Sequence, residues 1–216
     1  MRKVLFLTLL LAEGGGMIAA HHQIAGEPGL NKVAYLQSDG SQWIDTGIYQ
    51  TDSIEMFCRF MPVGRSVEWG TYCGCGAQDS SARNLLIRHP GSNIDKVSIW
   101  FAQTDFTTNE HQVDASQMID VSVRFGECTV NGVSHSIPSV AGRLAHLTIG
   151  LFCWNGAPSA QGPRRQPCRI ESFWLKDAGR LVLDYEPVEV DGIGYMHDRV
   201  TKRLFGNVGT GSFILP

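Results

Sequence analysis

Residues 118–138, with the sequence MIDVSVRFGECTVNGVSHSIP, decide the fold class. The first part of this stretch alternates apolar and polar residues, as a half-buried β-strand does. The apolar residues on the shared face are Ile119, Val121, Val123 and Phe125. Asn131-Gly132 then supplies two residues that tolerate positive φ, which suits the two-residue turn between twisted antiparallel strands. The stretch therefore predicts a hairpin that pairs 121–130 with 133–138.

The same alternation recurs from residue 53 to the end of the chain, with turn residues between the runs. The clearest further runs are SIEMFCRF (53–60), KVSIWFA (96–102) and LTIGLFCW (147–154). No window shows a helical period longer than two turns. We therefore expect an all-β fold, a two-sheet antiparallel β-sandwich, for which a jelly-roll order is favoured over an immunoglobulin-type order.

The N-terminal residues have the organisation of a secretory signal peptide. Arg2 and Lys3 form a basic start, residues 4–12 an apolar run, and Ala19 and Ala20 a small-residue exit. We expect a signal peptide over 1–20, with cleavage between 20 and 26, and a secreted or periplasmic protein. No later segment reaches the ~18 apolar residues of a membrane helix, so membrane insertion is not expected.

Length and charge limit the number of domains and the classes of partner expected for the remaining chain. About 190 residues suit one sandwich domain with a proper core, which we place at 30–216. The formal net charge is −3 and no basic stripe is present, which argues against a nucleic acid as partner.

Six cysteines, at 58, 73, 75, 128, 153 and 168, suit an oxidising compartment. Cys153 and Cys168 bracket a Gly- and Pro-rich loop whose ends we expect on adjacent strands, so a disulfide between them would staple its base. Cys73 and Cys75 lack the Cys-x2-Cys spacing of zinc sites, and no partner pair of metal ligands lies nearby. No metal site is predicted from them.

Three segments in order, SVRFGECTVNGVSHSIP, AHLTIGLFCWNG and CRIESFWLKDAGRLV, resemble laminin-G-like and concanavalin A-like jelly rolls. The two ends, AYLQSDGSQWIDTGI and DGIGYMHDRVTKRLFGNVGTGSFIL, resemble modules of secreted gut-bacterial proteins and phage surface proteins. The resemblance implies recognition of glycans or glycoproteins, and the gut-bacterial likeness implies host mucin as the ligand.

Loop aromatics are the candidate ligand-binding residues, because the apolar C–H faces of sugars stack on aromatic rings. Two arginines beside the long loop could hold the anionic group of a sulfated or sialylated glycan. The candidate residues are Trp69, Tyr72, Trp100, Trp154, Arg164 and Arg165. The alternative is that most of these aromatics fill the core.

The triplet Asp45-Thr46-Gly47 supports a second hypothesis, a mucin-degrading aspartic-type endopeptidase. Such enzymes need two carboxylates that share one proton, so Asp45 of a second chain would have to complete a homodimeric site. LTIG at 147–150 is similar to the apolar-apolar-Gly element that those enzymes place behind the aspartate. In the structural interpretation the protein is a monomer, the Asp45 side chain holds a turn, and Gly47 allows the bend.

Two other chemistries receive less support. Jelly-roll glucanases carry Glu-x-Asp-x-x-Glu on one strand, whereas Glu189-x-Asp191 is followed by Gly194 at the required position. If the chain is an enzyme, an endopeptidase is therefore favoured over a glycosidase. Laminin-G-like domains often bind calcium, but no linear pattern selects ligands, so calcium stays unassigned and no cofactor is predicted. The loop oxygens that could converge on such an ion belong to Asp79, Asp95, Asp105, Asn109 and Asp114.

Overall fold

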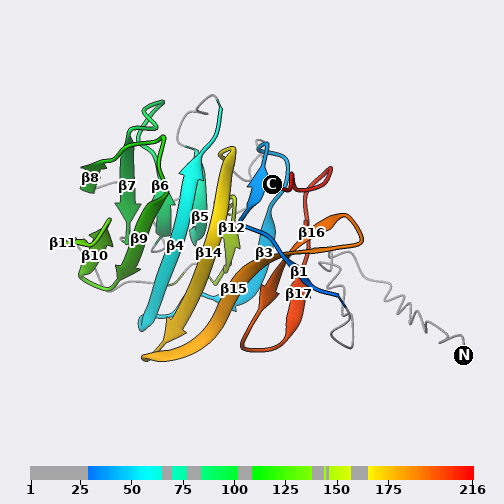
Figure 1. Cartoon of the computed structure of the whole chain (residues 1–216). Helices are drawn as coiled ribbons and strands as arrows, with labels where there is room; N and C mark the ends of the chain where they lie inside the picture. Colours follow the sequence, from blue (N-terminus) through cyan, green and yellow to red (C-terminus); the bar gives the residue numbers. More distant parts are fainter. Residues whose placement is uncertain are drawn as a thin grey trace, which may run out of the picture.

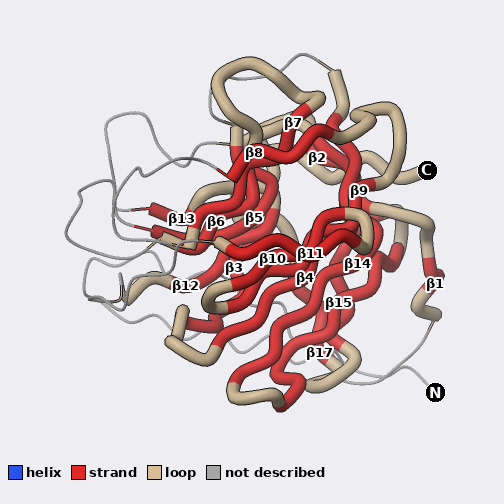
Figure 2. The backbone as a smooth tube through the Cα atoms, turned by 90° about the vertical axis from the view of Figure 1, so that its left-hand side faces the viewer, coloured by secondary structure: helices blue, strands red, loops and turns tan. Residues whose placement is uncertain are grey.

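The computed structural model describes residues 29–64, 70–76, 84–101, 109–137, 144, 146–156 and 165–216. The signal-peptide prediction for residues 1–20, with its cleavage region up to 26, lies outside these ranges. The described residues contain strands and loops and no helix, as Figure 2 shows. The strands are β1 Asn31–Lys32, β2 Leu36–Ser38, β3 Ile44–Tyr49, β4 Ile54–Pro62, β5 Thr71–Gly76, β6 Leu85–Arg88, β7 Lys96–Trp100, β8 Asn109–Gln112, β9 Ile119–Arg124, β10 Glu127–Val130, β11 Val133–Ser136, β12 Thr148–Leu151, β13 Asn155–Gly156, β14 Cys168–Asp177, β15 Arg180–Val190, β16 Ile193–Asp198 and β17 Arg203–Phe205.

These strands form two antiparallel sheets that pack as a sandwich. The larger sheet has the order β11-β10-β9-β4-β14-β15-β16-β17, with β1 beside β15 and β2 beside β14. The smaller sheet has the order β3-β12-β5-β6-β7-β8, and β13 adds a short parallel pair to β5. In Figure 1 the strands β9, β4, β14 and β15 lie side by side toward the viewer, with β5 and β12 behind them. The predicted all-β, two-sheet sandwich is confirmed.

The core follows from the alternation of the strands. In β4 the buried residues are Ile54, Met56, Cys58, Phe60 and Pro62, and the residues between them are partly exposed. Strand β9 behaves in the same way, so both strands direct one face inward and one outward. Phe60 stacks on Tyr72 of the smaller sheet, with ring centroids 4.1 Å apart. The two inner faces therefore interdigitate, as in other sandwiches.

The predicted Asn-Gly turn is present, with a shorter hairpin than expected. Asn131 has φ 47° and Gly132 has φ 81°, and the turn joins β10 to β11. The pairing partner of 133–136 is 127–130 and not the longer 121–130, because the chain already turns at Phe125-Gly126. Phe125 lies in that earlier turn and is 45% exposed, so it does not join the inner face of β9.

The predicted disulfide between Cys153 and Cys168 is not formed. All six cysteines are buried free thiols. Cys153 follows β12 of the smaller sheet, whereas Cys168 begins β14 of the larger one. The two ends of the long loop therefore lie in opposite sheets and are not adjacent strands, which removes the premise of the prediction.

The described residues also include no helix long and apolar enough to cross a membrane.

Candidate functional site

The outer face of the larger sheet carries two neighbouring aromatic side chains. Inner-face residues of β4 and β14 alternate with outward ones, so Phe57 and Trp174 both point away from the core. The antiparallel register places Trp174 directly opposite Phe57 on the adjacent strand. Both side chains are partly exposed. The two aromatic residues thus meet near the middle of an open sheet face.

The two rings form one continuous apolar surface. The centroids of Phe57 and Trp174 lie 5.4 Å apart and the ring planes differ by 10°, which is a stacked arrangement. The Lys176 ammonium lies 4.5 Å from the centroid of the Trp174 ring, in a cation–π contact. We call Phe57, Trp174 and Lys176 the aromatic platform.

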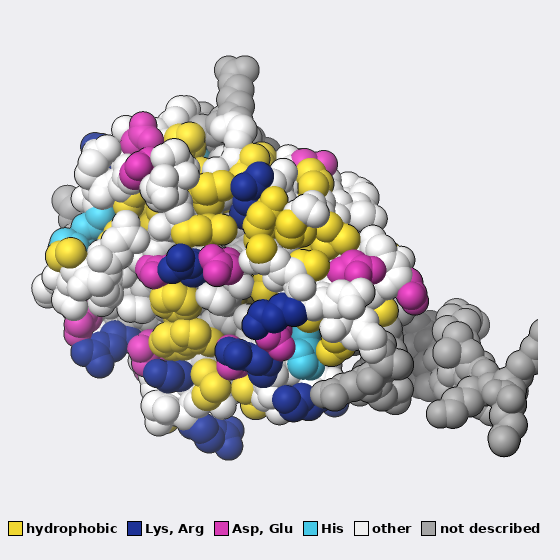
Figure 3. Space-filling model, viewed as in Figure 1, with side chains coloured by type: hydrophobic (Ala, Val, Ile, Leu, Met, Phe, Trp, Pro, Cys, Tyr) yellow, Lys and Arg dark blue, Asp and Glu magenta, His cyan; other side chains and the backbone are white. Residues whose placement is uncertain are grey.

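A charged row crosses the same face beside the platform. Arg59 Nε donates to Glu171 Oε2 at 2.8 Å, and Arg59 Nη1 donates to both Asp120 oxygens at 3.0 and 2.9 Å. The hydrogen bond that Arg59 donates to Glu171 raises the pKa of Arg59, and the charge of Asp120 adds to this effect. Figure 3 shows this face, where hydrophobic side chains gather between acidic and basic ones. The row fixes hydrogen-bonding groups next to an apolar surface.

An aromatic surface beside fixed hydrogen-bonding groups is suited to bind a sugar. The ring faces accept the C–H side of a pyranose, while carboxylate and guanidinium groups can bind its hydroxyls. The prediction from sequence missed both Phe57 and Trp174. The signal was present, because the alternation that puts Met56 and Cys58 inward puts Phe57 outward, and Phe173 and Leu175 do the same for Trp174.

The aromatics predicted from sequence lie elsewhere. Tyr72 has no exposed surface, and Trp100 and Trp154 are 8% and 7% exposed. Trp100 and Trp154 form a small apolar cluster with Leu86 on the other side of the smaller sheet from the main core, and the Trp154 indole N–H donates to the Gly76 carbonyl at 2.8 Å. These three aromatics therefore pack in the protein, as the alternative interpretation expected.

The remaining predicted ligand residues give less information. Arg165 donates from Nη1 to the Ser41 carbonyl at 2.9 Å, so its guanidinium is held against the opening segment of the domain. Trp69 and Arg164 lie outside the described residues. The structure thus does not bring the six predicted residues together in one described site.

The Asp45 carboxylate accepts a local hydrogen bond within strand β3. Asp45 Oδ1 accepts a hydrogen bond from the Gly47 N–H at 2.9 Å, and Gly47 has φ +70°. Thr46 Oγ1 donates to the Ile149 carbonyl at 2.8 Å, and Gly150 pairs with Asp45 across the β3–β12 ladder. The side-chain hydrogen bond and the positive φ expected for the triplet are present, but the triplet lies within β3, at an irregularity of the β3–β12 pairing, and does not end the strand. The Ile149-Gly150 element also lies against the triplet, as the similarity to aspartic proteases implied.

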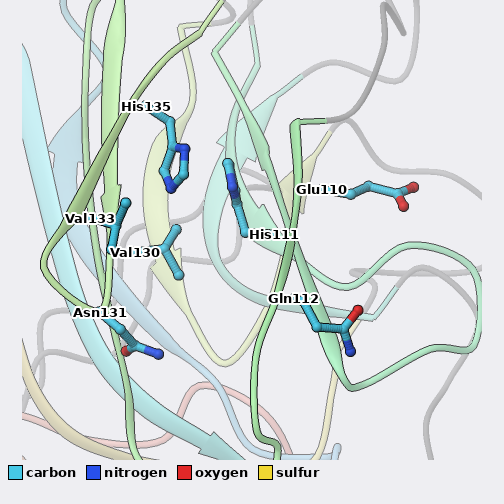
Figure 4. A pocket seen from close by; sticks show the side chains of 7 residues that line it. All are labelled: Glu110, His111, Gln112, Val130, Asn131, Val133 and His135. Carbon is cyan, nitrogen blue, oxygen red and sulfur yellow. The ribbon is translucent and has the colours of Figure 1, made fainter.

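A cavity of about 360 Å³ opens where the edge strand β8 of the smaller sheet faces the β10–β11 hairpin of the larger one. Figure 4 shows His111 and His135 pointing toward each other there, while Glu110 points away. The imidazole centroids lie 4.0 Å apart. The lining residues are Glu110, His111, Gln112, Val130, Asn131, Val133 and His135.

A cysteine beside this cavity has the wrong proton affinity for a nucleophile. Cys128 Sγ lies 3.7 Å from His111 Nε2. Burial, with a smaller contribution from Glu127, raises the pKa of Cys128 to about 11, and burial together with His135 lowers the pKa of His111. Both groups are thus neutral at pH 7, whereas a catalytic thiol needs a lowered pKa. The pair does not form an activated Cys–His dyad.

Metal ligands do not converge in the described part of the chain. Among these residues, no group of three or more His, Cys, Asp and Glu side chains could hold an ion. Of the acids considered for calcium, Asp79 and Asp105 lie outside the described ranges. Asp114 Oδ1 accepts hydrogen bonds from the N–H and hydroxyl of Ser116, in a turn of its own.

Stability is expected to fall as the pH drops from 7 to 5, because the buried His89 and the partly buried His111 resist protonation. Burial lowers the pKa of His89 and of His111 below the ordinary value of 6.5. Below pH 6.5 the unfolded chain binds protons that the folded chain does not, so acid favours unfolding. Thermal melts at pH 7.5, 6.5 and 5.5 should show a decrease of a few degrees in Tm. His89 contacts Gln166, and the variant His89→Gln should show a smaller decrease in Tm. A Tm independent of pH over this range would contradict the prediction.

Comparison with known proteins supports the fold. No protein-family model and no curated protein matches the sequence. A solved structure described as "a putative carbohydrate binding protein from Bacteroides ovatus" matches with a TM-score of 0.54 and 9% identity. The match covers 86% of this chain and 60% of that protein, so this chain spans about three fifths of the other's length. At this identity the likeness shows a shared two-sheet β-sandwich.

Proposed function

We propose that this protein is a secreted glycan- or glycoprotein-binding β-sandwich whose sugar site is the aromatic platform. The observation that carries the proposal is the stacked Phe57–Trp174 pair in the open face of the larger sheet. The description of the Bacteroides ovatus protein as carbohydrate-binding supports the same class of ligand. The signal-peptide pattern of residues 1–20 supports export.

The platform suits a sugar chain better than a charged small molecule. Its apolar rings lie beside Arg59, which forms ion pairs with both Asp120 and Glu171. These side chains are about 40% exposed, so their remaining hydrogen-bonding capacity faces the solvent where sugar hydroxyls would lie. An open sheet face fits a segment of an extended chain.

Host mucin is the specific ligand that we propose. The resemblance of both chain ends to secreted gut-bacterial modules supports it, because mucin is the abundant glycoprotein of that habitat. The protein without residues 1–20 should bind mucin-type glycans on an array and retain intact mucin in a pull-down. Binding to plant or bacterial polysaccharides alone would reject mucin but keep the glycan proposal, and binding to no glycan would reject both.

A second candidate function is an aspartic-type endopeptidase that acts as a dimer. The observation that favours it is the pairing of Gly150 with Asp45, together with the hydrogen bond from Thr46 to Ile149. Proton sharing between two such carboxylates, one from each chain, would let one activate water while the other protonates the peptide carbonyl. This function requires a dimer that brings the two copies of Asp45 together.

Under this second function, Asp45→Asn should abolish cleavage of casein or mucin without unfolding the protein. Asparagine retains a side-chain oxygen that can accept the Gly47 N–H, so the turn survives while the shared proton is lost. Fragments on a gel measure cleavage, and sedimentation measures the dimer. Asp39→Asn is the matched control, because Asp39 holds a similar turn through the Ser41 N–H and hydroxyl. Cleavage that Asp45→Asn leaves unchanged would reject this function.

A further inference from the structure

Four of the buried cysteines form one group in the core. The thiol of Cys73 is hydrogen-bonded to Cys58, and Cys153 and Cys168 lie near enough to interact with it electrostatically. Each of the four is fully buried. Cys75 interacts electrostatically with Cys153, and its own thiol lies 3.8 Å from Gln50 Oε1. Cys128 lies beside His111. Neither glycan binding nor the peptidase candidate uses these thiols.

The contact between Cys58 and Cys73 joins the two sheets. Cys58 belongs to β4 of the larger sheet and Cys73 to β5 of the smaller one. A register shift between Thr71 and Cys73 marks a bulge in β5, and both Tyr72 and Cys73 belong to the core. The neighbouring Phe60–Tyr72 stack at 4.1 Å shows that β4 and β5 approach closely at this level.

We propose that Cys58 and Cys73 form an inter-sheet disulfide when the chain folds under oxidising conditions. The two thiols lose two protons and two electrons, and one sulfur–sulfur bond forms. A disulfide such as oxidised glutathione accepts the two protons and the two electrons, and its own sulfur–sulfur bond breaks to give two thiols. The alternative of a metal centre receives no support, because no group of three metal ligands converges among the described residues.

The bond should form before the sheets close. Exchange proceeds through the thiolate, and burial raises the pKa of Cys73 well above its ordinary value. An oxidant also cannot reach a fully buried thiol. Strands β4 and β5 follow each other in the chain, so the two cysteines can meet early across a short loop. A crosslink stabilises the fold by lowering the conformational entropy of the unfolded chain, and for a short loop this effect is moderate.

Register argues against one competing pair. Cys168 pairs with Pro62 on β4, whereas Cys58 pairs with Phe173 on β14. Four residues along a strand correspond to about 13 Å. Disulfides require Cα atoms within about 7 Å, so Cys58 and Cys168 do not bridge without moving the sheet. A bridge between Cys153 and Cys168 is an outcome that the experiment distinguishes.

The test is to refold the protein in glutathione buffers that are either oxidising or reducing. The oxidised product should be lighter by two hydrogens, and a tryptic map should link the peptide ending at Arg59 to the peptide that contains Cys73 and Cys75. Fragmentation of the linked peptide then separates Cys73 from Cys75. Full reduction should lower Tm by roughly 6–12 °C.

Paired variants assign the effect. Cys58→Ala with Cys73→Ala should remove both the mass difference and the response of Tm to reductant. The double variant Cys153→Ala with Cys168→Ala is the matched control. It should keep both the mass difference and the response of Tm to reductant. If the double variant at 58 and 73 does not fold, the mass and the peptide map of the unaltered protein still decide. Six free thiols after oxidative refolding, or a crosslink that maps to another pair, would overturn the proposal.

Discussion

Trp174→Ala is expected to weaken binding of the best glycan ligand at least thirty-fold while the protein stays folded. Buried tryptophans at the centre of binding surfaces commonly contribute about 2 kcal/mol or more, and about 1.4 kcal/mol is tenfold in affinity. The indole provides the larger part of the stacked surface with Phe57 and carries the contact with Lys176. Its removal deletes the surface on which the sugar would stack. Titration calorimetry, or array binding at several concentrations, measures the change.

Controls separate loss of the site from loss of the fold. Trp174→Phe keeps an aromatic face and should retain most of the affinity. Tyr49→Ala removes an aromatic residue that is 58% exposed on β3 of the smaller sheet, so it should bind as the unaltered protein does. Tm of Trp174→Ala should fall by a few degrees only, since the side chain is partly exposed. Unchanged affinity of the folded variant would place the sugar site elsewhere.

The alternation of the strands made the fold predictable from sequence. In β4 and β9 one face is apolar and the other polar, which indicates both the strand and its inner face. The Asn131-Gly132 turn was equally readable, because few residue pairs suit its positive φ angles. The length of the hairpin was not, since the turn at Gly126 competes with a continuous strand and only tertiary packing decides between them.

The candidate site was predictable only in part. The alternation of side chains along β4 and β14 determines that Phe57 and Trp174 face outward. Their contact depends on which strands are neighbours, and β14 lies more than a hundred residues after β4 in the chain. The aromatics chosen from sequence failed for a related reason. Tyr72 lies in a β-bulge of β5. Trp100 and Trp154 bury each other and Leu86 in a second, smaller apolar cluster.

The cysteine pairing shows the same limit. Spacing along the chain suggested that Cys153 and Cys168 close a loop, yet loop ends in a sandwich can belong to opposite sheets. The cysteines in contact, Cys58 and Cys73, are separated by a crossing from one sheet to the other. No local pattern shows that crossing, so the partner of each cysteine depends on strand order.

Asp198→Ala is expected to destabilise the protein by about 3–5 kcal/mol. Asp198 is fully buried at the end of β16. Its Oδ1 accepts the N–H groups of Asp184 and Val200 at 2.9 and 3.1 Å. Its Oδ2 accepts the N–H and hydroxyl of Thr201 at 3.1 and 2.5 Å. One carboxylate thus satisfies four donors and ties the β16–β17 turn to β15.

Alanine would leave those four partly buried donors without their acceptor, and an unsatisfied buried group costs more than a typical hydrogen bond contributes. Asp198→Asn retains one side-chain oxygen and should lose roughly half as much, so the order of stability should be Asp, Asn, Ala. Asp95→Ala removes an exposed carboxylate and should change stability by less than about 0.5 kcal/mol. Urea unfolding measures all three variants. Equal stability of the Asn and Ala variants would mean that the charge, and not the four hydrogen bonds, holds this turn in place.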